Sequence, residues 1–95
     1  MSEGGSEAAT LKLRSQIQGR MMALLQARHP ASICPSEVAR ALTDNESDWR
    51  ALMPEVRNHA RELARAGVVL VAQRGTVLRT EQPYRGAIRL RLALK

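Results

Sequence analysis

The spacing of apolar residues in this chain changes at Gly67, and this change constrains the fold more than any other feature of the sequence. Before Gly67, apolar side chains recur at intervals of three and four residues, which is the repeat of helices that bury one face. After Gly67, β-branched runs and strict alternation follow, and these are typical of strands. We therefore expect an α+β fold in which helices precede a small sheet.

Two helices are expected first. An apolar repeat predicts one helix over about residues 11–28, which ends ahead of Pro30 because proline disfavours helical backbone in the residue before it. The segment PSEVARAL predicts a second helix over residues 35–42. Cys34 then occupies its N-cap, and Glu37 stands three residues later at the capping-box position.

A third helix is expected over about residues 47–66, with Gly67 as its C-cap. Its apolar face includes Trp49, which we expect to be largely buried. Pro54 interrupts the pattern because it removes an interior hydrogen bond. Either the helix kinks at this proline, or the helix begins near residue 53.

Strands are expected beyond Gly67. The run VVLVAQ predicts one strand, TVLR returns as another after a turn at Gly75, and AIRLRLA closes the chain as a third. A very short strand at ASI, ahead of Cys34, is also compatible with the pattern. Three helices followed by a β-hairpin wing, here residues 74–86, form the order of a winged helix-turn-helix.

The chain is long enough for one small domain, expected over residues 10–95. Residues 1–9 are small and acidic and predict a disordered tail. One cysteine cannot form an internal disulfide, and neither an apolar leader nor a membrane span is evident. We therefore expect a cytoplasmic protein without a membrane partner.

Positive charge is concentrated in the second half of the chain. Residues 1–48 carry five Lys and Arg against six acidic residues, whereas residues 49–95 carry ten against three. Thirteen of the fifteen basic residues are Arg, whose planar guanidinium matches phosphate groups and guanine edges. This segregation indicates a polyanionic partner, although an Arg-rich composition also serves solubility.

Five stretches are similar to one known family. They are CPSEVARAL, WRALM, VRNHARELARAG, QRG and RGAIRLR, and the resemblance that they mark covers about residues 15–92. Through them the chain resembles a small bacterial winged-helix family whose function is unassigned. The resemblance implies the fold and supplies no substrate, partner or catalytic residue, so DNA binding follows from it only by analogy of fold.

Enzyme and metal chemistry find little support in the residues. Cys34 lies at a helix N-terminus, where thiol pKa values are lowered, but no histidine is placed by the sequence to act as its base. We therefore expect a structural thiol. Glu55, His59 and Glu62 share one side of the third helix, yet ordinary surface pairs have the same spacing. No catalytic residue, metal or cofactor is expected.

The third helix carries the clearest candidate for binding. At 100° per residue, its arginines lie on the flank and back of the helix, away from the apolar face. The third helix of a winged helix enters the major groove, where Arg suits guanine and Asn suits adenine. Wing arginines suit phosphate contacts. The candidate nucleic-acid-binding residues are Arg50, Arg57, Asn58, Arg61, Arg65, Arg74, Arg79 and Arg85.

The sequence thus favours a non-enzymatic DNA-binding module, of the kind found in transcriptional regulators, with double-stranded DNA as its partner. Arg57 and Arg61 are expected to enter the groove, and Arg74 to contact a phosphate. For Arg89 and Arg91, phosphate contact and protection of an exposed sheet edge remain equally open.

The alternative is a protein–protein interaction module that presents the same basic surface to an acidic partner. RNA binding by stacking is disfavoured because Tyr84 is the one plausible aromatic platform. A homodimer would extend the small contact area of a single domain on DNA.

Overall fold

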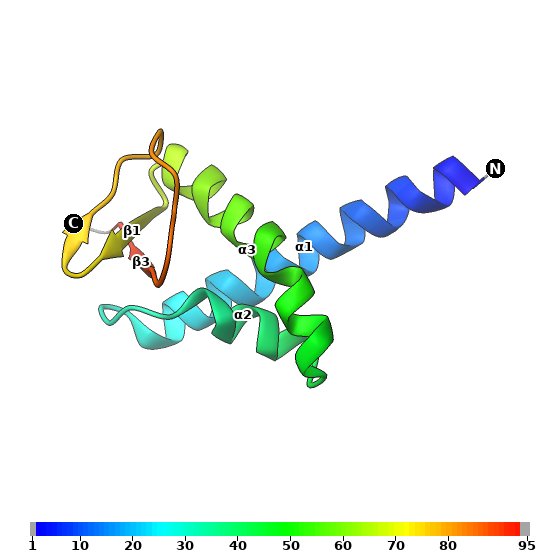
Figure 1. Cartoon of the computed structure of the whole chain (residues 1–95), viewed down its shortest axis with the longest axis horizontal. Coiled ribbons are helices and arrows are strands. Elements are labelled where there is room, and N and C mark those ends of the chain that lie inside the picture. The colour runs from blue at the N-terminus through cyan, green and yellow to red at the C-terminus, as the bar shows by residue number, and fades with distance from the viewer. Residues whose placement is uncertain (1, 94–95) are drawn as a thin grey trace.

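The helices come first in the chain and a small antiparallel sheet packs against them, as the change of spacing at Gly67 predicts (Figure 1). The computed structural model describes the backbone of residues 2–93 and the side chains of residues 11–93. Three helices followed by three strands confirm the α+β class and are consistent with a winged helix. The elements are α1 Ser2–Arg28, α2 Pro35–Leu42, α3 Glu46–Arg65, β1 Val69–Gln73, β2 Thr76–Val77 and β3 Arg89–Leu92.

The two halves of α1 have different surroundings. The second half contributes Ile17 and Met21 to the core, at 1% and 0% exposure, whereas Leu11 is 66% exposed on the half that projects from the body (Figure 1). The helix ends at Arg28, as predicted. It extends back to Ser2, where the sequence predicts a disordered tail over residues 1–9. Met1 and the side chains of residues 2–10 lie outside the described part, and the tail stays a prediction.

The entry into α2 matches the capping-box prediction. The backbone N–H of Cys34 donates to Glu37 Oε2 at 2.9 Å, and the Cys34 sulfur lies 3.2 Å from Ser36 Oγ. Glu37 also accepts from Arg28 at 2.8 Å, which ties the end of α1 to the start of α2. The Cys34 hydrogen bond, with help from Arg28, holds the pKa of Glu37 below its ordinary value, against the opposing effect of burial.

A single helix, α3, continues through Pro54 from its start at Glu46, so a start near residue 53 is wrong. Figure 1 shows α3 changing direction between its two halves, as expected for an interior proline. Asn45 caps the start by accepting from the Asp48 N–H at 3.1 Å. Gly67, with φ of +79°, closes the other end.

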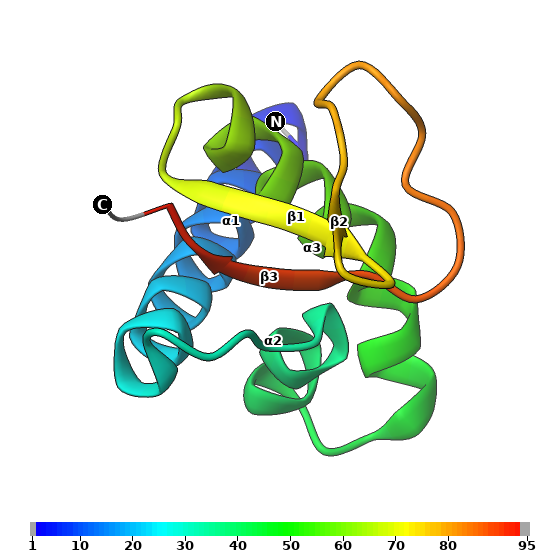
Figure 2. The ribbon, with the colours of Figure 1, turned by 90° about the vertical axis from the view of Figure 1, so that its left-hand side faces the viewer.

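The strand order β2-β1-β3 differs from a simple wing hairpin. The predicted β-hairpin exists as β1 and β2, joined through Arg74 and Gly75, but β3 pairs with the opposite edge of β1 (Figure 2). The chain must therefore cross from one edge of β1 to the other through residues 78–88, hereafter the wing loop. The expected short strand at ASI is a single antiparallel bridge between Ile33 and Leu90.

Every element except β2 contributes to the core, which contains no aromatic ring among its fully buried members. Trp49 is partly buried and packs against the edge of this core, which agrees with the expectation that most of its surface is buried. Its ring lies 4.6 Å from the guanidinium carbon of Arg40 and 5.4 Å from that of Arg50. Among the described residues, no helix has the length and apolar character needed to cross a bilayer. The buried apolar residues are Ile17, Met21, Leu25, Ile33, Val38, Ala39, Val56, Ala60, Val69, Val71, Ile88 and Leu90.

Two adjacent methionines provide a matched test of this core. Met21 is fully buried and Met22 is half-buried. We expect Met21→Ala to lower the free energy of unfolding by about 2–5 kcal/mol, because it leaves a cavity in a closely packed interior. Met22→Ala should lower it by clearly less. Urea denaturation of both variants measures the difference, and equal losses would show that the face of α1 is assigned wrongly.

Candidate nucleic-acid interface

Two arginines of α3 hold the wing loop in place. Arg57 donates to the carbonyl oxygens of Tyr84 and Gly86, at 3.0 and 2.8 Å. Arg61 donates to the carbonyl of Thr80 and, at 3.0 Å, to that of Gln82. The arginines that the sequence assigned to groove entry therefore bind backbone carbonyls of their own chain.

The ring of Tyr84 packs against Arg61, one of the two arginines that hold the wing loop. The Arg61 guanidinium carbon lies 4.0 Å from the centroid of the Tyr84 ring, which is a cation–π contact. Within the described residues, the buried Tyr84 hydroxyl has no hydrogen-bond partner. Burial raises the pKa of this hydroxyl, while the positive charges of Arg61 and Arg65 act in the opposite direction. The ring anchors the loop and is not an exposed platform for stacking on bases.

The other side of the wing loop is held by the sheet. The side-chain amide of Gln73, the last residue of β1, donates to the carbonyl oxygens of Arg85 and Ala87. The backbone at residues 84–87 is therefore fixed between α3 and the end of β1. Sequence reasoning missed Gln73 because its acceptors are backbone carbonyls, which every residue carries and no side-chain pattern marks.

This scaffold leaves three arginines exposed on three different segments. Arg65 lies on the last turn of α3, Arg85 on the wing loop, and Arg74 at the turn between β1 and β2. Within the described part of the chain, none of their side chains forms a hydrogen bond or an ion pair. Arg74 also has a positive φ of 52°, in the left-handed region that tight turns use.

The remaining candidates, Arg50, Arg79 and Asn58, differ in the partners of their side chains. Arg50 pairs with Glu46 at 2.7 Å, and Arg79 lies 3.8 Å from a carboxylate oxygen of Glu81. All four side chains are largely exposed, so these pairs contribute little to stability and leave the arginines open to exchange partners. Asn58 is exposed on α3. The structure thus separates two structural arginines from a set that faces solvent.

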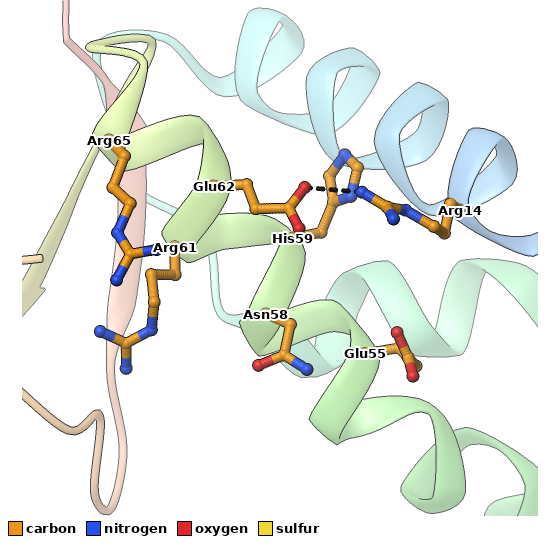
Figure 3. Close-up of a pocket in the computed structure, with 7 residues that line it drawn as sticks. All are labelled: Arg14, Glu55, Asn58, His59, Arg61, Glu62 and Arg65. Atoms are coloured by element: carbon orange, nitrogen blue, oxygen red, sulfur yellow. Dashed lines mark hydrogen bonds and ion pairs between the residues drawn. The ribbon is translucent and has the colours of Figure 1, made fainter. Parts of the chain in front are cut away.

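A hollow of about 290 Å³ lies beside α3 and is bordered by Arg14 of α1. Arg14 reaches across to Glu62 at 2.8 Å, while Asn58 and Glu55 project from the helix further along it (Figure 3). The carboxylates of Glu55 and Glu62 offset part of the positive charge of the arginines that line this hollow. Among the described residues, no group of three His, Cys, Asp or Glu side chains comes close enough together to hold a metal ion. The hollow is lined by Arg14, Glu55, Asn58, His59, Arg61, Glu62 and Arg65.

His59 is buried behind this hollow, at 7% exposure, and its Nε2 lies 3.0 Å from Gln18 Oε1. Burial lowers the pKa of His59 below its ordinary value of 6.5; Glu62 acts to raise it and Arg14 to lower it. The neutral imidazole joins α3 to α1, which is a packing role that the sequence did not assign to it.

A family model described as "Protein of unknown function (DUF3253)" matches residues 14–93. The match extends from α1 to the end of β3, so it includes α3, the wing loop and the exposed arginines. It agrees with the resemblance of the sequence to a family without an assigned function. No curated protein matches the chain.

The wing-loop anchors can be tested by amide hydrogen exchange. We expect Arg57→Ala or Arg61→Ala to accelerate exchange at the Arg79 and Gln82 amides by about tenfold or more, since a hydrogen bond from a charged donor contributes about 1.5–3 kcal/mol. Arg65→Ala is the matched control, because it removes an exposed arginine from the same helix without removing a hydrogen bond. Equal exchange in all three variants would contradict the anchoring role.

Burial of His59 predicts a pH-dependent stability. Because its pKa is lower in the folded protein, the unfolded chain binds more protons as the pH falls through about 6.5. The free energy of unfolding should therefore decrease between pH 7 and pH 5, an interval above the one in which Glu37 titrates. His59→Gln should flatten this dependence in urea denaturation at several pH values. A slope unchanged by the substitution would exclude His59 as its source.

Proposed function

Because the chain belongs to the DUF3253 family of proteins of unknown function, we propose its function from its surface: a non-enzymatic module that binds double-stranded DNA. The three-helix order with a wing supports this proposal, since the third helix of such folds enters the major groove. A role in transcriptional regulation in the bacterial cytoplasm is the setting that we propose for it.

The observation that carries the proposal is the arrangement of Arg65, Arg85 and Arg74. They lie on α3, on the wing loop and at the hairpin turn, and the hydrogen bonds of the wing loop join these three segments. Guanidinium groups that have no carboxylate partner can neutralise phosphates, which supplies most of the affinity of nonspecific DNA binding. Because the backbone of these segments is already fixed, less conformational entropy is lost when the three arginines bind DNA.

The roles that we propose within this surface differ from those expected from the sequence. Arg57 and Arg61 are positioning residues, because they place the wing loop and do not need to contact DNA. Exposed Asn58 on α3 becomes the best candidate for reading a base, since an asparagine amide matches the adenine edge. Arg74 keeps its expected role as a wing contact to phosphate.

An acidic protein partner is the second candidate, and one observation favours it. The wing loop lies against the Arg57 and Arg61 side of α3, so this part of the helix is not open for groove entry. A flat acidic surface would meet the exposed arginines without needing the helix to enter a groove.

Titration with random-sequence duplex DNA at several salt concentrations tests the proposal. If the exposed arginines neutralise about four phosphates, log K should fall against log salt with a slope of roughly −3.5. Arg74→Ala or Arg85→Ala should weaken binding to all sequences similarly and reduce the slope by about one unit. The matched control is Arg20→Ala, an exposed arginine on α1 away from the wing. Absence of binding at low salt would refute DNA binding and leave the acidic partner as the stronger proposal.

A further inference from the structure

Two more arginines are exposed on the face of the sheet that turns away from the helices. Ile88 and Leu90 are buried at 1% and 0% exposure, and the alternation of a strand directs Arg89 and Arg91 to the opposite side. Figure 2 shows β1 and β3 in front of the helices, and no other helix or strand of the described residues covers this face. The sheet therefore separates these arginines from α3.

A hollow of about 360 Å³ lies on this face, between the hairpin turn and the segment that follows α1. It is unlike the hollow beside α3, because no carboxylate of the described residues lines it. Among the described residues that line it, two guanidinium groups carry all the formal charge. The lining residues are Pro30, Ser32, Ala72, Gly75, Arg89 and Arg91.

Arg89 is held rigidly at the wall of the hollow. Its Nε donates to Ser32 Oγ and its Nη2 to the Ser32 carbonyl oxygen, both at 3.0 Å. Ser32 is itself fixed, because the neighbouring Ile33 exchanges two backbone hydrogen bonds with Leu90, at 2.7 and 2.8 Å. A guanidinium has five N–H donors, so three donors of Arg89 remain for a ligand.

Arg91 supplies a second positive charge two residues along the same strand. Within the described residues its side chain forms no hydrogen bond or ion pair, and strand geometry places the two Cα atoms about 6.5–7 Å apart. An oxyanion between the two side chains would receive charge-assisted hydrogen bonds from both. One preoriented and one unpaired guanidinium suit a group with several oxygens and at least one negative charge.

We propose that this hollow is a phosphate-binding site, separate from the surface formed by α3 and the wing loop. Its ligand is a phosphate group, either of a nucleic-acid backbone or of a small phosphorylated molecule. Planar guanidinium groups match phosphate oxygens in pairs. The site does not depend on the proposed DNA surface, because its two arginines lie on the opposite face of the sheet from α3.

Titration of the ¹⁵N-labelled protein with inorganic phosphate, followed by NMR, tests the site. At matched ionic strength in chloride, we expect saturable shifts at the amides of Ser32, Gly75 and Arg89. Arg91→Ala should weaken this binding about tenfold, the effect of losing one charge-assisted hydrogen bond. Arg20→Ala should leave it unchanged, and unaltered spectral dispersion will show that both variants fold. Shifts spread over all arginines, or insensitive to Arg91→Ala, would overturn the site.

The same spectra separate this site from the proposed function and identify the source of the phosphate. In a variant that combines Arg65→Ala, Arg74→Ala and Arg85→Ala, and so removes the whole proposed DNA surface, inorganic phosphate should still shift the Ser32 and Gly75 amides. If short duplex DNA also shifts them in this variant, the ligand is a nucleic-acid backbone; if only inorganic phosphate does, the ligand is a small phosphorylated molecule. Phosphate shifts in a wild-type protein that binds no duplex would refute the proposed function and support this site.

Discussion

The hydrogen bonds from Arg57 and Arg61 to carbonyls of the wing loop determine what this end of the molecule can present. The loop has no regular strand or helix of its own, so its carbonyls need partners from elsewhere. Guanidinium groups are suited to this task because each offers five donors in a fixed plane. Without them the loop backbone would lose its hydrogen bonds to α3, and residues 84–87 would keep only those from Gln73 on the side of the sheet.

This attachment follows from the strand order. Since β1 is central, the chain must cross from the β2 edge to the β3 edge, and the loop that crosses lies against α3. The crossing also divides the basic residues between two faces. Arg65, Arg74 and Arg85 accompany α3 and the loop, whereas Arg89 and Arg91 lie on the outer face of the sheet. A net charge concentrated in half of the sequence is therefore not one continuous surface in the fold.

Much of the fold could be predicted from residue spacing and local chemistry. The end of α1, the bounds of α2 and the closure of α3 at Gly67 depend on near neighbours in the sequence, and each was predicted within about a residue. The contact of Arg40 with the Trp49 ring was not predicted, because it depends on how α2 packs against α3. Less of the candidate site could be predicted from the sequence. Helix periodicity showed that Arg57 and Arg61 avoid the apolar face of α3. It did not show that these arginines bind a loop some twenty to thirty residues away in the chain.

The sequence by itself determined the order of elements, the helix caps, the alternation of β3 and the excess of arginine, because local backbone preferences and solvent exposure act over a few residues. Only the tertiary structure decided which arginines are structural and which face solvent. A guanidinium hydrogen-bonds equally well to a backbone carbonyl, a carboxylate or a phosphate. Its partner is therefore chosen by what the fold brings within about 3 Å, and here that is the wing loop for Arg57 and Ser32 for Arg89.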